Sequence, residues 1–192
     1  MSAREVDAST VAKAALETAV QDLLQGLAAG ADDARYGRSF EAVGHELEAW
    51  CRVAPRGISM KGLDGAPDWL THEMSAWELG ERVRGLAMPR LRRLQPESEV
   101  PRALEGFVAR TPLGKGRQCW ASFALDVGKA ATAARLGAAH LDDDEVNATV
   151  LTGLRKYRVT GFGEAAQRLA TGPSSRLTRR EARKYLSLGL ER

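Results

Sequence analysis

The sequence has few aromatic residues, only two cysteines and no long apolar run. Aromatic residues make up 6% of the chain. Cys51 and Cys119 are too few for a disulfide framework, and no Cys/His spacing predicts zinc, so both are expected to be buried thiols without a metal or cofactor. No segment approaches the roughly 18 apolar residues of a membrane span, and the first residues lack a signal-peptide core. The chain is therefore expected to be soluble and cytoplasmic.

Composition and charge favour one folded domain. Of 192 residues, 44% are hydrophobic and 28% are charged, which allows a sizeable core and is unlike a disordered chain. The formal net charge is only +3. Because dedicated nucleic-acid-binding proteins are usually more basic, no nucleic-acid partner is expected.

Apolar residues recur at helical spacing along most of the chain, and no stretch alternates with the period of two typical of strands. The first predicted helix begins at Ser9 or Thr10 and stops at Gly30, and the second begins at Asp32 or Asp33. The residues expected to be buried in these two helices are Leu16, Val20, Leu23, Leu27, Phe40, Val43, Leu47, Trp50 and Cys51.

Prolines divide the middle of the chain. Asp68 is expected to cap a third helix that carries Trp69, Ala76, Val83 and Leu86 and that bends or ends at Pro89. Pro96 and Pro101 are expected to flank a short fourth helix.

The second half of the chain also has helical patterns. One helix is expected to bury a narrow seam of Trp120, Phe123, Ala124, Val127, Ala131 and Ala134. The acidic run Asp142–Glu145 predicts a solvated helix start, and Thr178 with Glu181 predicts a capping box for the last helix. The expected fold is a single all-α bundle of about seven or eight helices over residues 1–192, with its core at about 10–170 and a basic C-terminal helix at about 177–190.

The most informative motif is a short glycine loop with two cations, Gly114-Lys115-Gly116-Arg117, which leads directly into an apolar helix. It is either a phosphate cradle or a recognition corner. A Walker A loop would need a glycine where Ala109 stands and a hydroxyl residue where Gly116 stands. The loop therefore does not fit a nucleotide-binding motif.

The glycine loop belongs to a longer block, Arg110-Thr111-Pro112-Leu113-Gly114-Lys115-Gly116-Arg117, followed by Trp120. Upstream come the acidic pair Asp32-Asp33, the helix end Glu46-Leu47-Glu48-Ala49-Trp50 and a glycine-rich connection to Trp69. This order of features resembles the RUN domain, an all-helical module of membrane-traffic adaptors. The family's block has Ala-Trp after the last arginine, whereas this chain has Gln118-Cys119-Trp120.

The resemblance implies a non-catalytic module that binds a GTP-loaded small GTPase of the Rab, Rap or Arf-like kind, and in some members a motor protein. It also implies peripheral association with endomembranes or vesicles through that partner. Mapped onto this chain, the partner-binding surface consists of Lys115 and Arg117 together with the cations Arg52, Arg56 and Arg110. A structural alternative stays open for Arg117, which could instead bind carbonyls at the end of the preceding helix and fix the corner.

One enzymatic interpretation stands as an alternative. Arg135 and His140 form an Arg-x4-His pattern that resembles the motif of HEPN ribonucleases. Leu136 stands where those enzymes usually have a polar residue, and Gly137 weakens the helix that would hold the geometry. A helical scaffold with an unknown partner is the remaining alternative.

Overall fold

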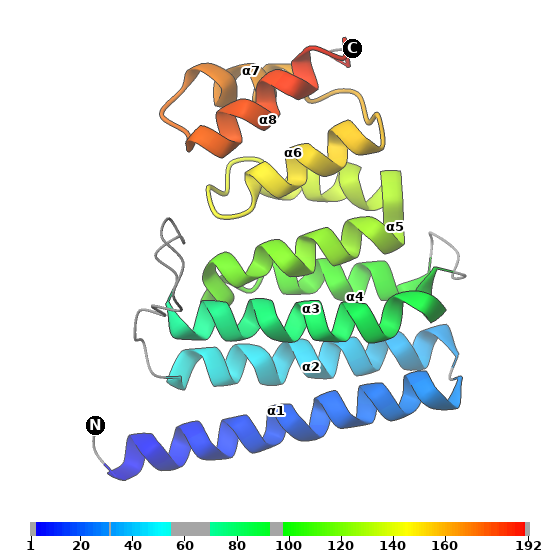
Figure 1. Ribbon diagram of the computed structural model, residues 1–192, viewed down its shortest axis with the longest axis vertical. Coiled ribbons are helices and arrows are strands. Elements are labelled where there is room, and N and C mark those ends of the chain that lie inside the picture. Colours follow the sequence, from blue (N-terminus) through cyan, green and yellow to red (C-terminus); the bar gives the residue numbers. More distant parts are fainter. Residues whose placement is uncertain (1–2, 31, 55–69, 93–97, 191–192) are drawn as a thin grey trace.

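The computed structural model describes residues 3–30, 32–54, 70–92 and 98–190 (Figure 1). Over these residues the chain forms eight α-helices and one short 3-10 helix, η1, and no strand element. The elements are α1 (Ala3–Ala29), α2 (Asp33–Val53), α3 (Thr71–Leu91), α4 (Glu99–Val108), η1 (Thr111–Gly116), α5 (Arg117–His140), α6 (Asn147–Lys156), α7 (Gly163–Thr171) and α8 (Arg176–Leu186). The predicted all-α fold is confirmed. None of the described helices is long and apolar enough to cross a membrane.

The helices stack in layers along the long axis of the molecule, from α1 at one end to α7 and α8 at the other (Figure 1). α1 packs on α2, α2 packs on α4, and both α3 and α4 pack on α5. α5 then packs on α6, and α6 and α7 pack on α8. The stack therefore buries two apolar clusters, one among the helices from α1 to the first half of α5 and one among α5, α6, α7 and α8.

The first cluster contains the predicted apolar faces of the early helices. Leu16, Val20, Leu23 and Leu27 of α1 are buried, as are Phe40, Val43, Leu47 and Cys51 of α2. Trp120 is at its centre: its ring stacks on Phe107 with 3.9 Å between centroids, and its Nε1–H donates to the carbonyl of Ala76. Phe123 and Val127 are buried with it, as predicted.

The predicted seam along α5 is correct only in its first half. Ala131 is exposed and Ala134 is half-buried, whereas Ala133 and Leu136 are buried. The reason is a kink at Lys129, whose φ is 51° and ψ is −131°. The kink rotates the rest of α5, so that a different face packs against the second cluster.

The second cluster joins α5, α6, α7 and α8. Inside it, the Thr178 hydroxyl donates to Asn147 Oδ1 at 2.7 Å, and both side chains are fully or almost fully buried. The predicted capping box of Thr178 and Glu181 is therefore wrong. The N-cap is instead Ser175, three residues earlier, whose hydroxyl accepts from the backbone N–H of Thr178, and the helix begins at Arg176.

Several predicted boundaries also change. α1 begins at Ala3, ahead of Ser9, while Gly30 follows its end with the positive φ typical of a helix stop. α3 runs two residues past Pro89. Pro101 lies within the first turn of α4, where the missing N–H has no intrahelical partner to lose.

Two further points concern α2 and α3. Asp32 caps α2 as predicted, because its carboxylate accepts from the N–H of Arg35. Of the apolar residues expected along α3, Ala76 and Val83 are buried and Leu86 is exposed. The predictions for Asp68, Trp69 and Pro96 lie outside the described residues.

Candidate functional site

The glycine corner is a tight junction between α4 and α5. η1 leads without interruption into α5 at Arg117. Gly114 has φ 51° and ψ −136°, and a Cβ on it would come within 2.0 Å of Glu73 Oε1. A Cβ on Gly116 would come within 2.7 Å of both the Ala76 Cβ and the Glu73 carbonyl oxygen. The two glycines therefore allow the backbone of η1 to pack directly on α3.

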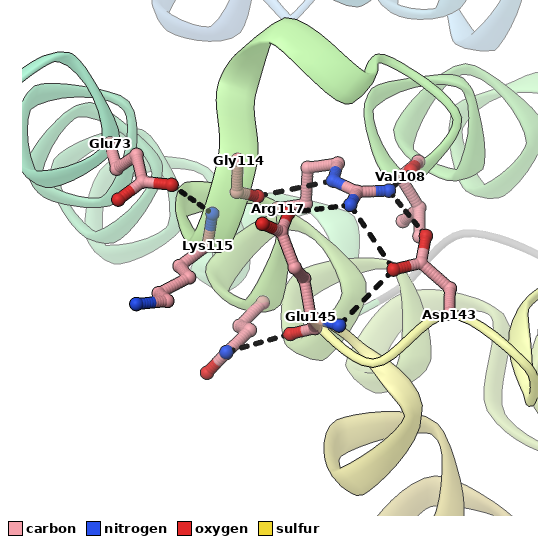
Figure 2. A network of polar contacts seen from close by, with 8 residues as sticks. Glu73, Val108, Gly114, Lys115, Arg117, Asp143 and Glu145 are labelled. Atoms are coloured by element: carbon pink, nitrogen blue, oxygen red, sulfur yellow. Dashed lines mark hydrogen bonds and ion pairs between the residues drawn. The ribbon is translucent and has the colours of Figure 1, made fainter. Parts of the chain in front are cut away.

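Glu73 fills the space that a phosphate would need. Its buried carboxylate accepts from the backbone N–H of Leu70 at 2.8 Å and from that of Lys115 at 3.1 Å (Figure 2). One carboxylate thus caps the start of α3 and binds the glycine loop. Because this internal anion already occupies the loop N–H and both glycines are buried, the corner does not form a phosphate cradle.

Arg117 points into the protein and binds four groups within it (Figure 2). Its Nε–H donates to the Gly114 carbonyl at 3.1 Å, and Nη1 donates to the Val108 carbonyl at 3.1 Å. Nη1 and Nη2 also bind the Asp143 carboxylate at 2.6 and 3.2 Å. Nη2 reaches Glu145 Oε2 at 2.7 Å. The side chain is only 4% exposed, so Arg117 does not belong to an accessible binding surface.

These contacts give Arg117 the structural role that the sequence left open. The Val108 carbonyl is at the end of α4, so the guanidinium caps that helix and ties it to the turn before α6. Burial alone would lower the pKa of Arg117, but the hydrogen bonds to Asp143 and Glu145 outweigh it and raise the pKa. The charge is therefore permanent and compensated.

The acidic run before α6 is more than a solvated helix start. α6 begins at Asn147, after the acidic residues. Asp143 and Glu145 bind Arg117, and the Glu145 carbonyl accepts from Gln118 Nε2 at 2.7 Å. The run thus holds the turn against the start of α5.

Two of the other predicted partner-binding cations lie together near the C-terminal end of α2. Arg52, at the end of α2, is exposed and binds Glu48 at 2.6 Å. Arg110, just before η1, is one-quarter exposed and binds the same carboxylate. Glu48 therefore joins the two arginines. The hydrogen bond from Arg52 lowers the pKa of Glu48. Burial opposes this shift, and the hydrogen bond from Arg110 lowers the pKa further. Arg56 lies outside the described residues.

Lys115 lies on the same side of the molecule as these arginines. Its backbone is held by Glu73 at the start of α3, next to the end of α2, where Cys51 Sγ faces the His72 carbonyl. The Lys115 side chain is half-buried and points away from the guanidinium of Arg117 (Figure 2). The structure thus places Arg52 and Arg110 on one carboxylate near the C-terminal end of α2 and Lys115 in the adjoining η1, whereas Arg117 is buried.

The sequence did not connect to the corner the carboxylates that organise this region. Glu48 and Glu73 precede the corner by some 60 and 40 residues, and Asp143 and Glu145 follow it by about 26 and 28. A partial signal was present. An arginine that is buried at a helix junction, such as Arg117, needs hydrogen-bond acceptors. The acidic run Asp142–Glu145 downstream could supply them.

The two residues of the ribonuclease alternative have separate surroundings. Arg135 binds the Glu105 carboxylate through Nε at 2.9 Å and Nη2 at 2.7 Å, and Nη2 also reaches Thr132. His140, at the end of α5, is half-buried. Burial lowers its pKa, with Asp143 opposing and Arg117 adding to the shift. No group of metal-ligating side chains occurs among the described residues.

Comparison of the chain with known protein families, curated proteins and solved structures finds no match.

Proposed function

We propose that this chain is a RUN-like helical module that binds a GTP-loaded small GTPase, without catalysis of its own. The proposal rests on the glycine-corner block and the order of helices around it, and one placement supports it. Arg52 and Arg110 share Glu48 near the C-terminal end of α2, and Lys115 lies in η1, which packs on α2 and α3. We call Arg52, Arg110 and Lys115 the corner cations.

The corner cations suit a protein partner that carries carboxylates. Arg52 is exposed, and Arg110 and Lys115 are partly exposed, so each can reach a partner without unfolding the corner. They sit on a rigid base, because Glu48 fixes both arginines and Glu73 fixes the Lys115 backbone. A preorganised cation loses less conformational freedom on binding than a flexible one. The role of Arg117 in this proposal is to hold the corner in shape.

A binding screen tests the proposal. The pure chain is immobilised and offered a panel of small GTPases, each loaded with a non-hydrolysable GTP analogue or with GDP. Preferential capture of at least one GTP-loaded member is expected. Capture of none, or equal capture of both nucleotide states throughout the panel, would contradict the assignment.

A further inference from the structure

The exposed face of α8 is strongly basic. This helix has five cations and a single carboxylate in eleven residues. Its excess positive charge is greater than the net charge of the whole chain, +3. The cations are Arg176, Arg179, Arg180, Arg183 and Lys184.

All five cations point away from the core. The buried side of α8 consists of Thr178, Glu181, Ala182 and Tyr185. At 3.6 residues per turn, the five cations fall within an arc of about 140° on the opposite side. They surround one shallow surface hollow together with Leu177 and Ser187. The helix lies at the far end of the stack, opposite α1 (Figure 1), and four of its five cations are exposed.

The charge on this face is only partly compensated. Glu181 is 6% exposed and binds Arg180 and Lys184 at 3.0 Å, with Arg155 of α6 at 3.5 Å. The Arg176 and Arg183 side chains have no ion pair or hydrogen bond with another described residue. A strongly positive helix face with this little compensation attracts an anionic surface.

Two apolar side chains favour a membrane as that surface. Leu177 is 47% exposed and lines the hollow, and Leu188, just after α8, is 41% exposed. Exposed leucines beside cations are typical of helices that lie in a membrane interface, where the cations meet anionic headgroups. The only aromatic residue of α8, Tyr185, is fully buried and cannot stack on a nucleic-acid base.

We propose that the outer face of α8 binds anionic lipid membranes, with the five cations on the headgroups and Leu177 and Leu188 at the acyl boundary. This contact would be direct, in addition to any recruitment through a GTPase. It would place the corner cations at a distance from the bilayer, since α2 and α8 lie at different levels of the stack (Figure 1).

Vesicle co-sedimentation of the whole chain, without any GTPase, tests this proposal. Vesicles of phosphatidylcholine alone are compared with vesicles that also contain phosphatidylserine, at low and high salt. Binding is expected only with phosphatidylserine and should weaken at high salt. The double variant Arg176→Gln/Arg183→Gln should lower the partition coefficient by roughly tenfold or more. A matched control, Arg38→Gln/Arg82→Gln, removes two exposed charges elsewhere and should bind like the wild type.

Three results would overturn the proposal. The first is equal binding to both kinds of vesicle, and the second is equal loss in the two double variants. The third is tighter binding to a labelled single-stranded RNA than to the vesicles, abolished by Arg176→Gln/Arg183→Gln, which would assign the face to nucleic acid. Unchanged far-ultraviolet circular dichroism of both variants keeps each result interpretable. Because no GTPase is present, these outcomes are independent of the proposed GTPase binding.

Discussion

Replacing Arg117 by methionine should destabilise the fold strongly, because the guanidinium is the buried centre of the corner. Its side chain is 4% exposed and binds two backbone carbonyls and two carboxylates. Removing one partner of a buried ion pair typically costs about 3–5 kcal/mol. Here Asp143 is 26% and Glu145 is 39% exposed, so both carboxylates can regain water.

That rehydration places the expected cost near the lower end of the range. The Val108 carbonyl loses a donor in a buried position, which costs about 1–3 kcal/mol. Methionine fills part of the vacated volume. We therefore expect a loss of about 3 kcal/mol, which corresponds to roughly 6–12 °C in Tm for a domain of this size.

Urea unfolding followed by circular dichroism measures this loss. The midpoint should fall while the slope m stays unchanged, because the surface exposed on unfolding is the same. Arg102→Met, which alters an exposed arginine of α4, is the matched control and should change stability by less than about 0.5 kcal/mol. If Arg117→Met unfolds with the midpoint of the control, the guanidinium does not hold the corner, and the structural assignment is refuted.

Gly114→Ala should lower the free energy of unfolding by about 2–4 kcal/mol, since its Cβ would lie 2.0 Å from Glu73 Oε1 at a positive φ. Gly30→Ala, at φ 72° in open space, should lower it by only about 1–2 kcal/mol. Equal losses of the two variants in urea unfolding would refute the close packing at Gly114. The two buried cysteine thiols, whose pKa values are raised chiefly by burial, should stay unreactive toward Ellman's reagent at pH 8 and react only after unfolding; fast reaction of the native chain would contradict their burial. Burial alone would raise the pKa of Asp126, but hydrogen bonds from Lys156 and Arg84 outweigh burial and lower the pKa. Asp126 therefore stabilises the fold above its unfolded pKa of about 3.9, and this stability is lost as the pH falls through the folded pKa. Asp126→Asn should destabilise the chain at pH 7 but not near pH 2. A loss of stability that is independent of pH would refute the pairing.

The parts of the fold that the sequence predicts are those set by local periodicity. The apolar faces of α1 and α2 follow from spacing alone, because each helix buries one continuous stripe. The cap at Asp32 follows from its side chain and position. The kink at Lys129 has no such signal. Periodicity continues through it, and only the packing of the second cluster against α6 reverses which alanines are buried.

The candidate site shows the same limit. The glycines, the cations and the apolar helix after them are local, and the sequence identified the corner from them. The direction in which each cation points depends on carboxylates that are far away in the chain. Asp143 and Glu145 draw Arg117 inward, and Glu73 binds the Lys115 backbone, which leaves its side chain on the other side of the corner. Spacing alone therefore left the structural and the binding roles of Arg117 open.

The central claim is that the corner cations bind a GTP-loaded GTPase. The affinity of a captured GTPase for the Lys115→Glu variant tests it most directly. Because charge reversal at an interface cation opposes acidic groups on the partner, the Kd should rise by on the order of tenfold or more, mostly through slower association at low salt. Lys115→Gln should give a smaller rise, and it keeps the test valid if the added carboxylate next to Glu73 lowers Tm. Arg38→Glu, at the opposite end of α2 from Arg52, is the matched charge reversal and should bind like the wild type. A Kd for Lys115→Glu equal to that of Arg38→Glu at every salt concentration would contradict the assignment of the corner cations as the partner-binding surface.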